Sequence, residues 1–497
     1  MKAVKRWRSD WRYPTTLLCI YGFFSTVKPL EPFLIAFLTG PDKNLTTEQV
    51  NNQIFPVWTY SYLSVLVPVF LLTDWLRYKP VVIFQCIALF ITTAMLLWTK
   101  TVLAMQTMQF FYGVVTASDV AYFSYIYSVI DLKKYRKATS YSRSVQLLGY
   151  TVGSVLGQLL VSFSLMSYSN ILVFTLVLTA IALLTSCLLP MPQQSMFFHR
   201  RHNVQKADAK SDGDEMVDAT ECTNRPKNSV EKIRDGKMDT IEETDEDAVK
   251  EENTYGAEHC EESVGKESCS QVFLHLWRDF IQCYSSRELL YWSVWWALAT
   301  CGYNQTVNYV QVLWEHVQPS QNISIYNGGV EAVSNLLGAA TSYGIGFTEV
   351  RWDKWGELAL GAFSGLGAAA LFLITFINNI WVCYTGYVIF KCLYMLLITI
   401  AMYQIAADLT MERYALVFGA NNFGALALQT VLTSIVVDSR GLGLAIIPQF
   451  IIYASYFSGI ALLFSLRGLF TIWRAKTNKT ETTPDKNESL VLDEQGF

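Results

Sequence analysis

Three carboxylates interrupt stretches of this chain that are otherwise apolar enough to cross a lipid bilayer: Glu31, Asp119 and Glu331. A charged side chain at the centre of a membrane helix costs about 2.5–3.5 kcal/mol even on the most lenient scale, so such residues usually face a cavity and serve a function. Carboxylates in a cavity attract positive charge. These three acids therefore predict a site for a cation.

Other chemistry is poorly represented in the sequence. It contains no P-loop, no G-x-S-x-G nucleophile elbow and no H-E-x-x-H zinc motif. Its 10 cysteines are scattered, without a C-x-x-C pair or a spacing to histidine that indicates zinc. We therefore expect no enzyme activity, no metal, no cofactor and no nucleic-acid partner.

The composition is typical of a polytopic membrane protein whose surroundings are the lipid bilayer. Hydrophobic residues make up 52% of the 497 residues and charged residues only 16%, whereas soluble domains are nearer a quarter charged. A span needs about 20 mostly apolar residues. Twelve runs meet this condition, near residues 14–38, 57–76, 80–99, 104–130, 142–166, 170–190, 289–315, 325–348, 356–376, 379–406, 413–437 and 445–473.

Basic residues mark one side of the predicted membrane. Besides the N-terminus, the basic loops contain Arg77 and Lys79, Lys133 to Lys137, Arg200 and Arg201, Arg351 and Lys354, and Arg474 with Lys476. The positive-inside rule places these loops and both termini in the cytoplasm. The sequons at Asn44 and Asn322 then lie outside, where we predict glycosylation.

A long polar segment divides the spans into two sets of six. Residues 191–285 are predicted to be a cytoplasmic, largely disordered linker, because the segment is rich in Asp, Glu, Lys, Ser and Thr. It is either a simple tether or a regulatory segment. Residues 1–190 and 286–473 are predicted to form six-helix bundles, and 474–497 a disordered tail. This all-α plan of twelve transmembrane helices is that of the major facilitator superfamily, whose halves rock around a midplane site.

Several longer strings resemble the reduced folate carrier family, which transports folates and thiamine. They are GPDKN at 40–44, PVWTYSYL at 56–63, WSVWW at 292–296, RYALVFG at 413–419 and VDSRGL at 437–442. The resemblance covers nearly every span and fails only in the linker and tails. It implies the major facilitator fold and transport of a vitamin.

Substrate charge divides this family, because folates are dianions and thiamine is a cation. The resemblance implies that folate carriers have Arg where this chain has Asp119, and Lys where it has Gln429. The chain is therefore more similar to the thiamine transporters. It departs from them where they usually carry Glu in place of Asp119, Glu in place of Gln109, and Arg in place of Lys28.

The resemblance also implies a set of substrate-binding residues. Phe55 and Trp58 would clamp the pyrimidine of thiamine, with Glu31 close by. The remaining members would line the cavity or hydrogen-bond the ring edge: Gln109, Tyr112, Asp119, Tyr150, Asn308 and Glu331.

Each of these residues also has a structural interpretation. Aromatic residues are common in packed spans, and Asn308 could make an interhelical hydrogen bond. Glu331 could pair with Lys391, and Asp119 with Lys28, Arg143 or Lys391. Glu31 and Lys28 have a spacing that permits pairing on one helix face.

Four charged residues are predicted to pair or to gate transport. Asp74 and Arg77 follow the second span in a loop that partly matches the superfamily's D-R-x-G-R-K motif. Lys28 precedes Glu31, and Lys391 is the lone basic residue well inside the tenth predicted span. An unpaired lysine there would be costly, so we expect Lys391 to neutralise a carboxylate in at least one conformation.

These observations predict a multi-pass plasma-membrane protein that takes up thiamine by alternating access. Three alternatives remain open from the sequence: a carrier of another organic cation or vitamin such as pyridoxine, a reduced folate carrier, and a non-transporting receptor with the same fold. The sequence leaves the oligomeric state and the driving force undetermined.

Overall fold

The computed structural model describes residues 12–129, 132–192, 269–320, 325–345, 352–407, 409 and 411–481. Within these residues the chain is helical. Most of the predicted linker, residues 193–268, lies outside the described part, and so does the tail beyond residue 481.

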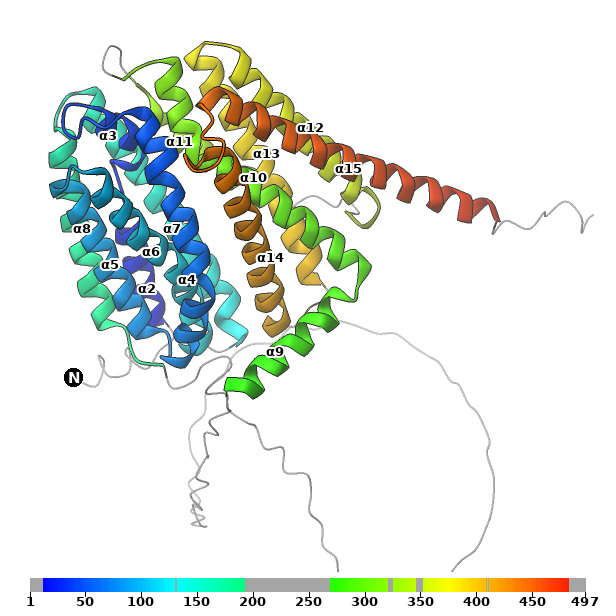
Figure 1. Cartoon of the computed structure of the whole chain (residues 1–497). Helices are drawn as coiled ribbons and strands as arrows, with labels where there is room; N and C mark the ends of the chain where they lie inside the picture. The colour runs from blue at the N-terminus through cyan, green and yellow to red at the C-terminus, as the bar shows by residue number, and fades with distance from the viewer. Residues whose placement is uncertain are drawn as a thin grey trace, which may run out of the picture. The chain divides into compact units, whose positions relative to one another are not determined.

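Figure 1 shows the long helices in two adjacent groups, one from residues before 193 and one from residues after 268. The first group contains α2 (Arg12–Thr26), α3 (Leu34–Thr39), α4 (Phe55–Trp75), α5 (Lys79–Trp98), α6 (Val102–Val129), α7 (Leu132–Ser162) and α8 (Tyr168–Leu188). The second contains α9 (Cys269–Tyr284), α10 (Arg287–Val317), α11 (Asn327–Ile345), α12 (Trp352–Phe376), α13 (Ile380–Ala407), α14 (Met411–Leu432) and α15 (Ile446–Glu481).

Nine helical segments in the described part of the chain are long and apolar enough to cross a membrane. Three predicted spans fold as helices but are too polar to be among them: α6, α10 and α11. These three helices contain Gln109 and Asp119, Asn308, and Glu331, respectively. A helix that lines a polar cavity can carry such residues, because that face avoids lipid.

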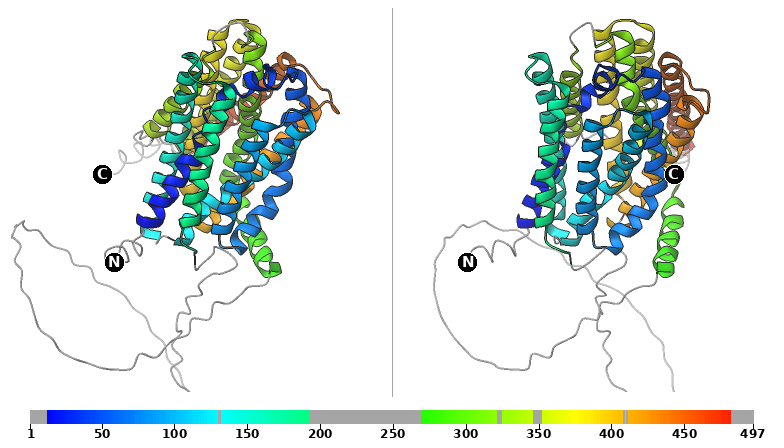
Figure 2. Two further views of the ribbon diagram at one scale, coloured as in Figure 1. Left: turned by 90° about the vertical axis from the view of Figure 1, so that its left-hand side faces the viewer. Right: turned by 60° about the vertical axis from the view of Figure 1, so that its left-hand side comes forward.

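The two groups of helices pack against each other through α7 on α11 and through α4 on α14. Figure 2 shows that most of the long helices run side by side in a bundle. The largest core cluster lies mainly in the second group, where Trp295, Trp296, Trp314 and Tyr387 are fully buried. This packing fixes the helices that carry the candidate site.

The first predicted span, 14–38, is not one continuous helix. The chain leaves α2 at Thr26 and resumes with a short 3-10 turn, η1 (Glu31–Phe33), before α3. Pro29 and Pro32 explain the break, since proline lacks an N–H and disfavours helix in the preceding residue. Irregular backbone at membrane depth is tolerated where protein covers it or where it lines a cavity.

The GPDKN string forms the loop that follows α3. The Lys43 ammonium is buried and donates to the carbonyl oxygens of Leu97 at 3.0 Å and Thr99 at 2.5 Å. Burial lowers the pKa of Lys43. Lys43 thus caps the C-terminal end of α5. Asn44 is exposed beside it, as a glycosylation site requires, whereas Asn322 lies outside the described residues.

Asp74 and Arg77 lie in the tight turn between α4 and α5. Asp74 is buried and accepts a hydrogen bond of 2.5 Å from the Tyr78 hydroxyl. Arg77 and Tyr78 both have left-handed backbone, with φ of 57° and 63°, which is uncommon outside glycine. The residues therefore shape the turn, and their role in gating stays a prediction.

Candidate substrate site

One cavity of about 510 Å³ lies between the two groups of helices and is lined by both. Its size falls within the usual range for small-molecule sites. All nine residues predicted to bind substrate line this cavity, and so do Lys28 and Lys391. The nine come from five helices and from the break after α2, at Glu31, Phe55, Trp58, Gln109, Tyr112, Asp119, Tyr150, Asn308 and Glu331.

A row of glycines on α7 holds the broken segment of the first span in place. A Cβ on Gly149 would overlap the Thr26 hydroxyl, and a Cβ on Gly157 would overlap the Pro29 carbonyl oxygen. Between them, a Cβ on Gly153 would lie 2.8 Å from the backbone nitrogen of Lys28. The spacing of four residues puts all three glycines on one helix face. This close approach of α7 to residues 26–29 positions Lys28 and Glu31 at the cavity.

We predict that Gly157→Ala lowers the thermal stability of the folded protein. The added methyl group meets backbone at Pro29, which cannot rotate away, and overpacking of this kind costs about 1–3 kcal/mol. Gly459→Ala on α15 is the matched control, because nothing lies within 4 Å of its Cβ position. Thermal unfolding of the purified variants measures the difference. Equal unfolding midpoints for Gly157→Ala and Gly459→Ala would contradict the close approach of α7 to Pro29.

Lys28 and Glu31 do not pair directly, because a tyrosine stands between them. The Lys28 ammonium donates to the Tyr112 hydroxyl at 2.9 Å, and that hydroxyl lies 3.5 Å from a Glu31 carboxylate oxygen. The pairing that their spacing would permit on one helix face is not made, because α2 ends before Lys28 and Glu31 begins the separate turn η1. The main chain at Glu31 is fixed by Gln311, whose amide donates to its carbonyl at 3.0 Å.

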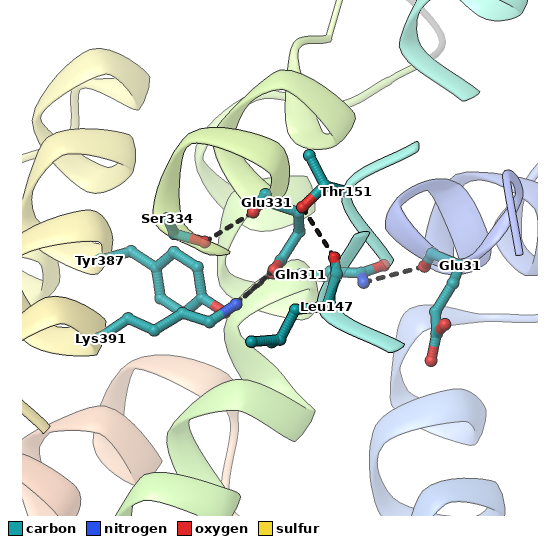
Figure 3. Close-up of polar contacts among 8 residues, drawn as sticks. All are labelled: Glu31, Leu147, Thr151, Gln311, Glu331, Ser334, Tyr387 and Lys391. Atoms are coloured by element: carbon teal, nitrogen blue, oxygen red, sulfur yellow. Dashed lines mark hydrogen bonds and ion pairs between the residues drawn. The ribbon is translucent and has the colours of Figure 1, made fainter. Parts of the chain in front are cut away.

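Glu331 and Lys391 form an ion pair inside the cavity (Figure 3). Their closest nitrogen and oxygen atoms lie 2.7 Å apart, and the side chains are only 16% and 6% exposed, respectively. The Tyr387 hydroxyl donates to the other oxygen of the Glu331 carboxylate at 2.8 Å. Glu331 is on α11, and both of its partners are on α13. The predicted neutralisation of a carboxylate by Lys391 is thus present in this conformation.

The aromatic residues predicted to clamp a ring lie together at the start of α4. Phe55 and Trp58 are three residues apart and so share a helix face. Phe55 contacts the ring of Tyr309 across the cavity at 6.1 Å between centroids. The Trp58 indole nitrogen donates to Thr116 at 3.1 Å, which fixes the plane of the ring.

Asp119 extends into the cavity from α6, and its bonded partner there is not a cation. The Gln85 side-chain amide donates to the Asp119 carboxylate. Among the described residues, none of the three alternative pairings of Asp119, with Lys28, Arg143 or Lys391, is made through a direct bond. Asn308 and Gln109 also line the cavity. Among the described residues, the Asn308 amide makes no interhelical hydrogen bond, which leaves it available to a ligand.

Three residues whose roles in gating or in substrate charge were predicted from the sequence do not line the cavity: Asp74, Arg77 and Gln429. Gln429 is fully buried and accepts a hydrogen bond from Asn304 at 3.3 Å. The presence of Gln429, where folate carriers are expected to have lysine, therefore does not change the cavity wall directly in this conformation.

Several residues of the cavity wall were not predicted from the sequence. Gln85, Tyr303 and Gln311 all line the cavity, and Tyr387 reaches it through Glu331. Gln85 could have been predicted from the sequence, because it lies inside the very apolar run 80–99 and polar residues inside spans are costly. The tyrosines gave no signal, because the chain contains 27 of them.

The charges on the cavity wall do not balance. Three carboxylates, Glu31, Asp119 and Glu331, face two lysines, Lys28 and Lys391, which leaves one net negative charge. With an aromatic pair and several amides beside it, the wall is suited to a flat organic molecule that carries one positive charge.

This fold is shared with membrane transporters of known structure. The structure is similar to the crystal structure of the nucleoside transporter NupG, with a TM-score of 0.54 over 92% of this chain and 98% of that one. At 12% identity the likeness shows the fold alone.

The family model described as "Reduced folate carrier" matches residues 9–452, so the chain belongs to this family of membrane carriers rather than to an enzyme family. The resemblance read from the motifs is thus confirmed. The chain is 52% identical to thiamine transporter 1 of Mus musculus, over 94% of this chain and 91% of that protein. It is 47% identical to thiamine transporter 2 of Homo sapiens, over 97% and 95%. Identity to the reduced folate transporter of Homo sapiens is 36%, over 92% of this chain and 72% of that protein.

Proposed function

We propose that this protein takes up thiamine across the plasma membrane. The observation that carries the proposal is the single excess negative charge on a cavity wall that also presents Phe55 and Trp58. Thiamine joins a flat aminopyrimidine to a thiazolium with one permanent positive charge, so both halves of the molecule find a partner. A folate dianion would meet net repulsion. Higher identity to the thiamine transporters than to the reduced folate transporter supports the same choice.

We propose Phe55 and Trp58 as the clamp for the pyrimidine. In this proposal, Gln109, Asn308 and Glu331 hydrogen-bond the ring edge. The remaining residues of the predicted set supply the negative field and the aromatic wall: Glu31, Tyr112, Asp119 and Tyr150.

Transport in this proposal proceeds by alternating access between two six-helix bundles, 1–190 and 286–473. The proposal includes twelve spans, both termini in the cytoplasm, and glycosylation at Asn44 and Asn322. Hydrogen bonds join the bundles near the loops predicted to lie outside. The Tyr60 hydroxyl donates to Asp438 at 2.7 Å, and the Asn52 side chain donates to the Gly443 carbonyl at 3.0 Å. Opening toward the outside would have to break these bonds, since bundles rock as units.

Uptake of labelled substrates by cells that lack their own carrier tests the proposal. We expect saturable thiamine uptake above vector control and little uptake of pyridoxine or reduced folate. Uptake of either compound in preference to thiamine would favour the corresponding alternative carrier. Binding of thiamine without counterflow would favour a receptor.

We predict that Gln109→Glu lowers the KM for thiamine. Gln109 is 6% exposed and lines the cavity, and a carboxylate there accepts from the amino group of the substrate more strongly than an amide does. Charge-assisted hydrogen bonds are worth about 1.5–3 kcal/mol against roughly 1 for neutral ones, so we expect a severalfold change. Concentration dependence of initial uptake rates measures it, and a higher KM for the variant would contradict the placement of Gln109.

A further inference from the structure

A buried glutamine outside the predicted site is bonded to one of the cavity acids. Gln85 is on α5, 5% exposed, and its neighbours Cys86, Ala88 and Leu89 are buried in apolar packing. An amide in such surroundings is costly unless its polar atoms are satisfied. Gln85 satisfies both ends of its amide within the helices of the first group.

The two ends of this amide have fixed partners on two different helices. The Tyr21 hydroxyl, on α2, donates to the Gln85 side-chain oxygen at 2.8 Å. That bond turns the amide nitrogen toward α6, where it donates to the Val115 carbonyl at 3.3 Å and to one oxygen of the Asp119 carboxylate. Since an amide nitrogen carries two hydrogens, both are used.

We propose that Gln85, oriented by Tyr21, is a positioning residue that holds the Asp119 carboxylate ready for the cation. The inference rests on the proposed function and adds two residues to it. Asp119 is exposed within the cavity, so without a fixed donor its carboxylate would have to be ordered when the substrate binds. Such ordering weakens binding, and a preformed geometry avoids it. The bond occupies one carboxylate oxygen and leaves the other for the substrate.

The competing explanation is that Gln85 only ties α5 to α6 for stability. The two explanations differ in one measurable respect. A positioning residue acts through Asp119, so its removal has no further effect on substrate affinity once the carboxylate is gone. A purely structural residue affects folding or surface amount whether or not Asp119 is present.

The test is a double-mutant cycle in the full-length protein, read as the KM for labelled thiamine with Vmax normalised to surface protein. The variants are Gln85→Leu, Asp119→Asn and the double variant. We expect Gln85→Leu to raise the KM about tenfold, the effect of losing a hydrogen bond to a charged group, with Vmax per surface copy changed less than about twofold. The double variant should match the KM of Asp119→Asn.

Gln449 provides a matched control within the same chain. It is fully buried on α15, accepts from the Tyr453 hydroxyl at 3.5 Å and donates to the Leu444 carbonyl at 2.7 Å. In the described part of the chain no carboxylate is bonded to it, and it does not line the cavity. Gln449→Leu should lower the surface amount without changing the KM. Tyr21→Phe keeps the shape of the side chain and should raise the KM less than Gln85→Leu does. This increase should be absent when Tyr21→Phe is combined with Asp119→Asn.

Two results would overturn the inference: an unchanged KM in both Gln85→Leu and Tyr21→Phe, or KM increases that multiply in the double variant. A failure of the proposed function looks different, because wild-type protein would then take up no thiamine above vector control. If Gln85→Leu does not reach the surface, the cycle of Tyr21→Phe with Asp119→Asn decides in its place.

Discussion

Glu331→Gln is expected to reduce thiamine uptake to less than about a tenth of the wild-type rate at equal surface amount. The glutamine retains the shape of the side chain but removes the charge that faces Lys391 at 2.7 Å. Removing one partner from a buried pair leaves the other charge uncompensated and costs about 3–5 kcal/mol. The cavity would also lose its excess negative charge, so its wall would become neutral toward a cation.

The matched control for this variant is Glu357→Gln. Glu357 also pairs with a basic residue, Arg467, at 3.0 Å, but it is more exposed and does not line the cavity. We expect it to transport thiamine normally, because Glu357 lies away from the cavity in which we propose that the substrate binds. Unchanged uptake by Glu331→Gln at matched surface expression would remove Glu331 from the site.

Lys391→Met is expected to impair both transport and folding. Among the described residues, the methionine leaves the Glu331 carboxylate, which is only 16% exposed, with the Tyr387 hydroxyl as its one partner. Surface biotinylation and thiamine uptake should therefore both fall. If uptake and surface level stay normal, Lys391 has no role in neutralising the acid.

The double variant Glu331→Gln with Lys391→Met separates folding from transport. Replacing both members of a buried pair removes the uncompensated charge and is often neutral for stability. Surface amount should therefore recover relative to Lys391→Met alone, while uptake stays low. Recovery of uptake along with surface amount would show that the pair serves only the fold.

Residue chemistry predicted the members of the site better than it predicted their bonds. Acids inside apolar runs must face a cavity, and Glu31, Asp119 and Glu331 do line one. Which cation faces which acid depends on the packing of helices that are far apart in the sequence. Lys391 meets Glu331 across 60 residues, whereas Lys28 meets Tyr112 in place of the nearby Glu31.

The break in the first span also depends on contacts between distant segments, which the sequence alone does not predict. The prediction of one span over 14–38 followed the length of the apolar run and did not weigh Pro29 and Pro32, which disfavour a continuous helix. The glycines of α7 at 149, 153 and 157 provide the space for the broken segment. Their regular spacing was visible, but the segment that they approach was not, because a glycine row fits any close neighbour.

In the proposed function, net negative charge in this cavity selects a positively charged vitamin for transport. Purified protein in liposomes, with thiamine and reduced folate offered separately at equal concentration, measures this selection without other carriers. We expect saturable entry of thiamine and no entry of folate above protein-free liposomes. Ready entry of folate with none of thiamine would contradict it.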